Sequence, residues 1–532
     1  MFIKRSYKKV GKKNYSTVLL THGFRENGKV KHKTLANMSS WPEDLVSAIE
    51  KIIKGGKFDF DFENMQSEQG KSFGALYTLS VIADRLGITK AFGKSKEAKL
   101  CLAMILGRIL NQGSRLSLVS WQKDQSIEEV LKIPAFNEDQ LYYAMDWLDE
   151  NNLEIEKKIF KSRYHNETPT FYLYDVTSSY FEGEMNELAK YGYNRDGKKG
   201  KKQIVIGLLA DGEGMPIAGR VFEGNTQDPK TVETQIELLA KEFGVKNLVF
   251  VGDRGMIKRE QQKQISSKED WYFITAVTKP EIEKMLSRNL IQMELFTEDL
   301  GFIEEAGTRL IFRRNPIRQS EIRKNRTDIF ESFKNQIEKK NQYLQEHLKA
   351  KATTSILHLT KWIKKRNLEN CVLIKEENRM IRFEIDKDKV EKLEKLDGCY
   401  VIKTNVPTEI ATEKEIHDRY KDLKHVENNF RNLKTFLLEV RPIFHRKAAR
   451  TKALVNIAVY ALMIIKYLER ETDEINLTTE YKIKTLEKIN YWIFNIGSHK
   501  VKQIPKILKE DQTRILKKLK ITLPIYLDKR ML

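Results

Sequence analysis

The stretch TFYLYDVTSSYFEG, residues 170–183, contains a run of aromatic and β-branched side chains that is typical of a strand inside a sheet. A carboxylate, Asp175, lies in the middle of this run, between Tyr174 and Val176. Aspartate is depleted in strands, and a buried carboxylate without a partner is unfavourable. The sequence therefore predicts a strand at residues 170–176 and raises the question of what compensates its one charge.

Strands and helices alternate after this strand. A basic loop leads into residues 204–224, where two apolar runs flank the turn Asp211–Gly214 and predict a hairpin. Asp228 and Pro229 predict the cap and the first turn of a helix, and a strand, a helix and a strand follow. The order β, β, β, α, β, α, β predicts a mixed sheet with helices packed on it.

The flanking segments differ from this α/β core in pattern. Residues 15–37 alternate around Glu26-Asn27-Gly28, which predicts a hairpin, and residues 78–163 show helical periodicity. We expect this division: a basic N-terminal β-hairpin region at 1–77, an all-helical DNA-binding domain at 78–165, the first part of the core at 166–280, a β-containing insertion at 281–397, the completed core at 398–470 and a basic helical C-terminal region at 471–532.

The composition indicates a polyanionic partner. The 532 residues include 95 Lys and Arg against 74 Asp and Glu, a formal charge of +21, which favours nucleic acid although a solvated basic surface is the alternative. The three cysteines, Cys101, Cys371 and Cys399, have no metal-ligand spacing and fit a reducing compartment. The apolar run at 453–465 is too short to span a bilayer, so we expect a buried core helix and no membrane.

A second carboxylate interrupts an apolar pattern at residues 413–438, which predict one long helix. The apolar stripe of this helix consists of Ile416, Tyr420, Leu423, Phe430 and Leu437. Glu427 and Lys434 occupy the two missing positions, so both are predicted to point toward the protein body. The alternative is a partly exposed Glu427 that bridges to Arg431 one turn later.

The third carboxylate, Asp253, ends the apolar strand before VGDRGM, although Asp before Gly is also ordinary turn chemistry. Asp175, Asp253 and Glu427 together could converge only if cations compensate their charge. Hard oxygen ligands suit Mg²⁺ or Mn²⁺. Two such ions about 4 Å apart can activate a hydroxyl nucleophile and stabilise the leaving oxygen of a phosphodiester. The chemistry thus predicted is metal-dependent phosphodiester cleavage.

Other motifs do not support a different chemistry. The run from Gly192 to Lys199 is not a P-loop, because Lys199 stands where a Ser or Thr would bind magnesium and no strand precedes it. A basic loop that touches a nucleic-acid backbone is the better interpretation. The lysines that we expect to make this contact are Lys198, Lys199, Lys201 and Lys202.

These motifs resemble the DDE-type transposases of bacterial insertion sequences, in the superfamily numbered four. The family signature on the glutamate helix is Tyr, two residues, Arg, three residues, Glu, six residues and Lys; Tyr420, Glu427 and Lys434 match it, and Leu423 replaces the arginine. The arginine's DNA contact is then absent or falls to Lys424. The resemblance extends through YDVTSSYFEG and GDRGM to the segment Arg108–Ser117, and so covers nearly the whole chain.

The resemblance implies a ribonuclease H-like core in which Asp175, Asp253 and Glu427 bind two Mg²⁺ or Mn²⁺ ions. It implies a transposase that binds terminal inverted repeats as a synaptic homodimer, cleaves the DNA by hydrolysis and joins the 3′-OH to target DNA, in some relatives through a hairpin intermediate. Tyr420, Lys434, Lys424 and Arg254 would contact DNA. The implied location is the bacterial cytoplasm, at the nucleoid.

Two alternatives remain open at this point. A degenerate relative could bind DNA without catalysis, although all three acids are present. A ribonuclease H-like nuclease could cut without strand transfer, although the long insertion and the flanking domains argue against it.

Overall fold

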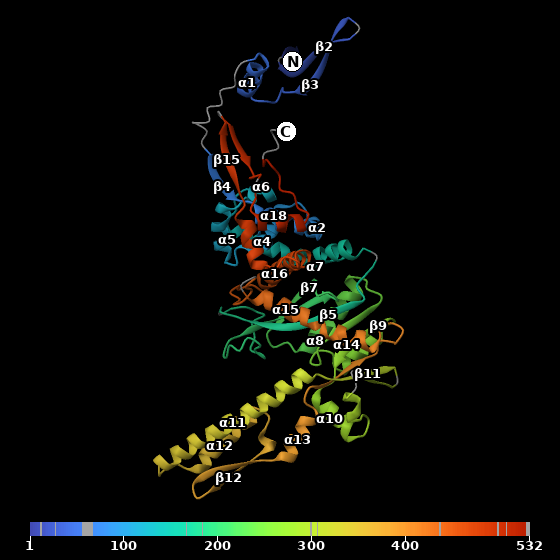
Figure 1. Ribbon diagram of the computed structural model, residues 1–532, viewed down its shortest axis with the longest axis vertical. Coiled ribbons are helices and arrows are strands. Elements are labelled where there is room, and N and C mark those ends of the chain that lie inside the picture. The colour runs from blue at the N-terminus through green and yellow to red at the C-terminus, as the bar shows by residue number, and fades with distance from the viewer. Residues whose placement is uncertain are drawn as a thin grey trace. The chain divides into compact units, whose positions relative to one another are not determined.

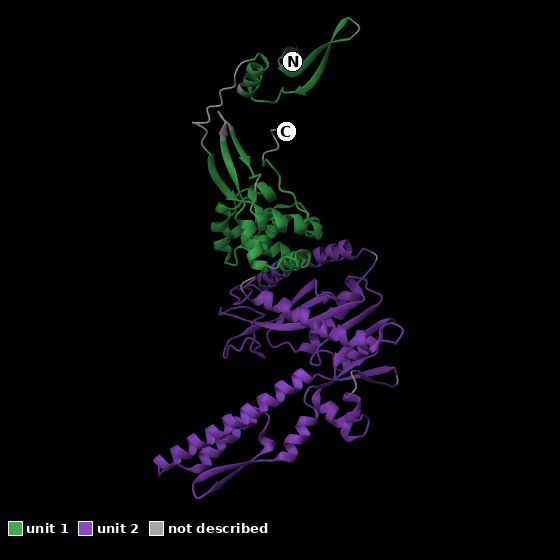
Figure 2. Ribbon diagram, in the orientation of Figure 1, with its two compact units in different colours: residues 1–151, 460–532 green, residues 152–459 purple. Residues whose placement is uncertain are grey.

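The computed structural model describes residues 1–10, 13–26, 28–55, 67–165, 167–183, 185–297, 300–305, 307–435, 438–496, 499–506 and 508–527. The chain forms two compact units (Figure 2). One unit combines residues 1–151 with 460–532, and the other comprises residues 152–459. The stretch quoted first lies in the second unit.

An eight-stranded mixed sheet forms the centre of the second unit (Figure 1), in the order β10-β11-β14-β9-β8-β5-β6-β7. Strand β8 runs parallel to both of its neighbours, β5 and β9, and all other neighbouring strands are antiparallel. The strands are β5 (Phe171–Tyr180), β6 (Gln203–Asp211), β7 (Pro216–Glu223), β8 (Leu248–Gly252), β9 (Trp271–Ala276), β10 (Gly301–Glu305), β11 (Thr308–Arg314) and β14 (Cys399–Thr404). The expected α/β fold with a mixed sheet is confirmed.

The first strand, β5, is longer than the sequence predicts. It continues through Thr177, Ser178 and Ser179, which are small polar residues but are buried and paired with β6. The hairpin from β6 to β7 forms as expected, and Asp211 closes its turn by accepting hydrogen bonds from the N–H groups of Glu213 and Met215.

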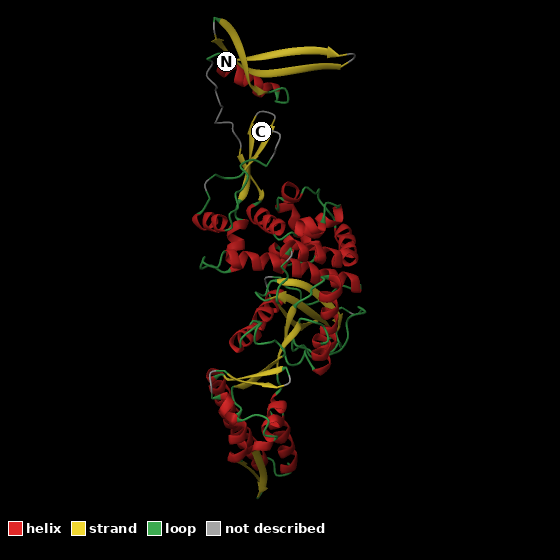
Figure 3. Cartoon of the chain, turned by 90° about the vertical axis from the view of Figure 1, so that its right-hand side faces the viewer, coloured by secondary structure: helices red, strands yellow, loops and turns green. Residues whose placement is uncertain are grey.

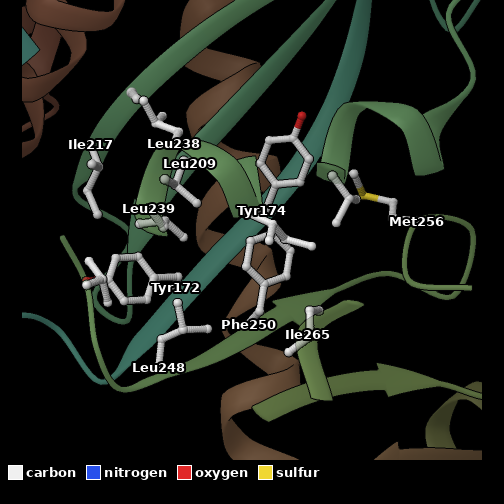
Figure 4. Close-up of a cluster of buried hydrophobic side chains, with 14 of the residues drawn as sticks. Tyr172, Tyr174, Leu209, Ile217, Leu238, Leu239, Leu248, Phe250, Met256 and Ile265 are labelled. Carbon is white, nitrogen blue, oxygen red and sulfur yellow. The ribbon is translucent and has the colours of Figure 1, made fainter. Parts of the chain in front are cut away.

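Helices α8 (Asp228–Glu237), α9 (Arg259–Ser266) and a π-helical turn (Leu238–Glu242) contribute to the core of the sheet. Tyr174 of β5 packs against Phe250 of β8 with ring centroids 5.9 Å apart (Figure 4). Asp228 is not the cap that the sequence predicts, because Gln227 occupies that position. The aromatic packing holds β5 beside β8 directly before the two aspartates.

The insertion has its own small core around Phe333 and Ile337. Figure 3 shows that the chain combines helices with strands. Its charged helix α11 spans Pro316–Glu346, and strand β13 spans Met380–Ile385, within the insertion that was expected to contain β structure. The further elements described between residues 277 and 398, apart from the sheet strands β10 and β11, are α10 (Lys279–Ser287), a 3-10 turn (Met293–Phe296), α12 (Ala352–Lys364), a second 3-10 turn (Glu369–Cys371), β12 (Val372–Glu377) and α13 (Lys387–Lys395).

The predicted long helix at 413–438 is two helices, α14 (Glu413–Lys421) and α15 (Leu423–Lys434), which meet at Asp422. The N–H of His425 donates to the Asp422 carbonyl, so the chain tightens there. Leu437, the last residue of the predicted stripe, lies outside the described residues. The tightened turn changes which side chains of α15 are buried.

The first unit contains helices and two small sheets. Strands β1 (Phe2–Val10), β2 (Lys13–Glu26) and β3 (Lys29–Asn37) form an antiparallel sheet beside α1 (Glu43–Ile53). The predicted hairpin pairs Glu26 with Lys29, and Asn27 lies outside the described residues. The helices are α2 (Gly74–Arg85), α3 (Ile88–Phe92), α4 (Lys96–Leu110), α5 (Arg115–Trp121), α6 (Ile127–Leu131), α7 (Glu138–Tyr164), α16 (Ala448–Glu471), α17 (Thr479–Glu487) and α18 (Glu510–Lys518); α7 and α16 continue into the second unit.

The expectation of an all-helical N-terminal domain is not confirmed. Strand β4 (Ser67–Ser72), directly before the domain expected at 78–165, pairs with β15 (Asn490–Ile496), which pairs in turn with β16 (His499–Gln503). Strands β15 and β16 lie in the C-terminal region at 471–532, which was expected to be helical. The pairing of β4 with β15 joins residues more than 400 positions apart, so local periodicity could not reveal it.

One described helix, α16, is long and apolar enough to cross a membrane by length and composition alone. Its most apolar window is 78% buried within the structure, as in the core helix of a globular protein.

Candidate active site

Sheet register places Asp175 and Asp253 side by side. Tyr174 of β5 pairs with Gly252 of the parallel strand β8, and each aspartate is the next residue in its chain. Side chains alternate between the faces of a sheet, so neighbours in register point to the same face. The predicted neighbourhood of the two aspartates therefore follows directly from strand pairing.

Asp175 is partly buried, and its Oδ1 accepts a hydrogen bond of 2.7 Å from the N–H of Val176. Burial raises the pKa of its carboxyl to about 7, and the negative charges of Asp253 and Glu427 add to this shift. The Val176 N–H and the positive charge of Arg195 act in the opposite direction. The surroundings of Asp175 thus disfavour its charged form, which a bound cation could stabilise.

Asp253 begins the loop after β8 and is exposed. Its Oδ1 accepts hydrogen bonds from the N–H of Arg254, at 2.7 Å, and from the hydroxyl of Tyr420 in α14, at 3.3 Å. Burial and the charge of Asp253 raise the pKa of Tyr420, so its hydroxyl stays protonated and can donate. Tyr420, which belongs to the predicted signature, therefore holds the carboxylate of Asp253 in place.

Glu427 lies on α15, which packs against β5 (Figure 1). The prediction that it points inward with the apolar stripe is wrong, because the buried side chains of α15 are Val426, Asn429, Phe430 and Leu433 and Glu427 itself is exposed. Its charge nevertheless raises the pKa of both Asp175 and Tyr420. Glu427 therefore stands at the edge of the buried face, within electrostatic range of the aspartates.

Lys434, at the end of α15, is mostly buried and donates to Asp196 at 2.9 Å. Arg441 donates to the same carboxylate at 2.8 Å, and the N–H of Tyr180 in β5 donates at 3.2 Å. The side chain of Asp196 is only 2% exposed. Asp196 therefore ties the strand that carries Asp175 to the helix that carries Glu427.

The remaining predicted DNA contacts lie at the surface. Arg254 and Lys424 are exposed beside the carboxylates in sequence, and Leu423 is half-buried. Lys198, Lys199 and Lys201 are exposed and Lys202 is half-buried, all within the loop between β5 and β6. Lys201 is paired with Glu182 at 2.7 Å.

Sequence reasoning missed three charged residues near the site: Arg195, Asp196 and Asp228. Arg195 donates to both carboxylate oxygens of Asp228 at 2.7 Å. One signal was present, because Asp196 is the single acid within the basic run at residues 192–202, and a lone acid among cations is commonly paired. Its partner Lys434 is 238 residues away, which no local pattern specifies.

The donor set fits a hard divalent cation, although its atoms are not in a coordination arrangement. Across the described ranges, no three His, Cys, Asp or Glu side chains lie close enough together to hold a metal ion. Asp175, Asp253 and Glu427 supply only carboxylate oxygens, the ligands that suit Mg²⁺ and Mn²⁺. Burial raises the pKa of Asp175 and repulsion from Asp253 and Glu427 adds to this shift, whereas a bound cation would favour the charged carboxylates.

Two family models agree with the motifs. Residues 166–464, more than half of the chain, match the family described as transposase DDE domain, and residues 3–66 match the N-terminal domain of IS1634 family transposases. A solved structure, the piggyBac transposase synaptic complex with hairpin DNA, is 12% identical with a TM-score of 0.35, over 78% of this chain and 70% of that chain. No curated protein sequence matches significantly.

Proposed function

The chain belongs to the DDE transposases of insertion sequences, and on this premise we propose that Asp175, Asp253 and Glu427 are its catalytic carboxylates. The protein is a transposase, an enzyme that cleaves DNA and transfers strands. The observation that supports the assignment is the register between β5 and β8, in which Tyr174 pairs with Gly252 directly before Asp175 and Asp253. The charges of Asp253 and Glu427 both act on the pKa of Asp175, which supports including Glu427.

We further propose that the core is ribonuclease H-like. The strand order β7-β6-β5-β8-β9, with β6 antiparallel and β8 parallel to β5, supports this finer assignment. In this arrangement the site lies where the first strand and its parallel neighbour lead into loops.

The three carboxylates would hold Mg²⁺ or Mn²⁺, with two ions as the expected number. A bound divalent cation supplies Lewis-acid stabilisation of the charge that develops on phosphodiester oxygens. The chain's own groups prepare the site: Tyr420 orients Asp253, and Asp196 holds α15 against β5. Exposed Arg254 and Lys424, and the lysines of the loop after β5, supply positive charge for the DNA backbone.

The DNA that the enzyme acts on is proposed to be the terminal inverted repeats of an insertion sequence and a target duplex, held by a synaptic homodimer in the bacterial cytoplasm. The match of residues 3–66 to an insertion-sequence N-terminal domain and the formal charge of +21 support this proposal. A nuclease without strand transfer is the competing function, and the joining of ends distinguishes the two.

The test uses the full chain, Mg²⁺ and DNA that carries the ends of the insertion sequence. Wild type should cut at the element's end and then yield joined products, whereas Asp175→Asn should do neither and still bind the DNA. Asp270→Asn is the matched control, because Asp270 is an exposed turn residue with φ of 58°, a conformation that asparagine tolerates. Cleavage by Asp175→Asn would disprove the assignment, and cleavage without joining by wild type would favour the nuclease.

A further inference from the structure

The loop between β5 and β6 presents exposed aromatic rings among its cations. Tyr191 and Tyr193 are 66% and 82% exposed. The guanidinium of Arg195 lies 5.7 Å from the ring centroid of Tyr193, and the ammonium of Lys202 lies 6.0 Å from that of Tyr191. Rings interleaved with basic side chains are the surface on which unpaired nucleotides stack. The lysines were predicted from the sequence to contact a backbone, but the tyrosines were not assigned any role.

The backbone that carries Tyr193 is fixed from behind. The side-chain amide of Gln203 donates to the carbonyl of Tyr193 at 3.0 Å and to that of Gly224 at 2.8 Å. A Cβ on Gly192 would lie 2.0 Å from the Gly224 carbonyl oxygen, and one on Gly224 would lie 1.9 Å from the Gln203 carbonyl oxygen. Only glycine fits at these two positions, so the chain packs closely here and holds the exposed ring of Tyr193 on a defined backbone.

A cavity of about 430 Å³ opens beside this ring. Its volume falls within the range of about 300–1,000 Å³ that is typical of small-molecule sites. Its lining includes Tyr193, Arg195, Gln203, Asn225, Asp228 and Lys258.

Gln203 is 1% exposed, and within the described structure its Oε1 accepts no hydrogen bond. Both amide hydrogens of Gln203 are engaged, so the remaining oxygen can act only as an acceptor. A buried acceptor without a donor is unfavourable, and an N–H at the edge of a nucleobase is a suitable donor once the Gln203 side chain turns this oxygen toward the cavity.

The cavity adjoins the candidate active site. Arg195 lines it, and the N–H of Arg195 donates to the hydroxyl of Ser178, three residues after Asp175 in β5, at 2.9 Å. Gly255, two residues after Asp253, lies on its wall as well. A nucleotide in this cavity would therefore belong to the stretch of DNA whose phosphate is at the carboxylates.

We propose that Tyr193 and the adjoining cavity form a binding site for an unpaired nucleotide next to the scissile phosphate. The base stacks on the Tyr193 ring, and its edge faces Gln203. This inference rests on the proposed function for the identity of the DNA, but stacking itself requires neither metal nor cleavage.

The test measures binding by the full chain in EDTA. The probe is a twelve-nucleotide single strand, oligo-dT with one central 2-aminopurine, and the reference is the duplex of the same length. We expect Tyr193→Ala to weaken single-strand binding about 5- to 150-fold and to abolish the quenching of 2-aminopurine fluorescence. Duplex binding should change less than about twofold, and Tyr193→Phe should behave as wild type because it keeps the ring. Tyr343→Ala, which removes a 47% exposed tyrosine from the insertion helix α11, is the control and should bind both probes as wild type does.

Two results would overturn the inference. Unchanged single-strand binding by Tyr193→Ala would show that the ring is not a stacking platform. An equal loss for single strand and duplex would show that the loop contacts only the backbone. Either result leaves the proposed function intact if wild type still cuts and joins element ends, whereas cleavage by Asp175→Asn would refute the catalytic assignment without touching the binding data.

Discussion

The two aspartates and the glutamate reach the site by different routes. Asp175 and Asp253 are set by the hydrogen-bonded register of β5 and β8, with Tyr174 and Phe250 packed directly before them. Glu427 instead depends on how α15 packs on β5. Backbone hydrogen bonds of the sheet fix the positions of Asp175 and Asp253, whereas side-chain contacts hold α15. The position of Glu427 should therefore be more sensitive to substitutions outside the site.

The largest expected effect concerns one carboxylate beside the sheet, Asp253, and the carboxylate of the helix, Glu427. Asp253→Asn and Glu427→Gln should each lower DNA cleavage at least about a thousandfold if all three carboxylates act as a unit. Rates of cleavage of end-containing DNA measure this. Glu409→Gln, an exposed residue in the turn before α14, is the control for the glutamate change. If Asp253→Asn lost activity and Glu427→Gln kept it, Glu427 would not be part of the active site.

The second effect isolates the side-chain contact that holds the helix. Asp196→Asn keeps the shape but removes the charge that pairs with Lys434 and Arg441. Residues that orient metal ligands typically contribute about 10- to 100-fold. We expect a fall of that size in the cleavage rate, a raised Mg²⁺ requirement and unchanged DNA affinity. A lower melting temperature with a normal Mg²⁺ requirement would make Asp196 merely structural.

A smaller effect is expected from the hydrogen bond that Tyr420 donates to Asp253. Tyr420→Phe deletes the hydroxyl that donates to Asp253 across 3.3 Å, and a single neutral hydrogen bond is worth about 1 kcal/mol. We expect a loss of cleavage of about fivefold, with most of it recovered at high Mg²⁺. If Tyr420→Phe instead weakens DNA binding with normal cleavage at saturation, Tyr420 contacts DNA rather than the ligand.

The smallest effect is on stability and follows from the raised pKa of Asp175. The carboxyl titrates near pH 4 in the unfolded chain and at about pH 7 in the folded, metal-free protein. Between these values the folded state binds more protons, so this group's contribution to stability falls as the pH rises and is least favourable above pH 7.

Asp175→Asn removes that contribution. In EDTA, its melting temperature should exceed that of wild type by about 2–4 °C at pH 8 and by less at pH 5, where Asp175 is already neutral. Thermal unfolding at the two pH values measures this, and Mg²⁺ at pH 8 should stabilise wild type but not the variant. A difference between the proteins that is independent of pH would contradict the raised pKa.

The same contrast explains what the sequence could predict. Asp175 interrupts an apolar strand and Asp253 ends one. Because these two strands pair, the closeness of the two aspartates was predictable. Glu427 was assigned to the site by its spacing from Tyr420 and Lys434, but its burial was misjudged because the turn at Asp422 shifts the buried face of α15. The partners of Asp196 were not predictable, since Lys434 and Arg441 come to it only through the tertiary fold.

The most direct test of the central claim, that the three carboxylates share one cation site, is iron-mediated backbone cleavage. Fe²⁺ replaces Mg²⁺, and ascorbate with peroxide generates radicals that cut the chain near the bound ion. If the three carboxylates share the site, the fragments should end near Asp175, Asp253 and Glu427, and excess Mg²⁺ or Asp175→Asn should suppress all of them. Cuts near only one of these residues, or cuts that survive Asp175→Asn, would contradict this claim.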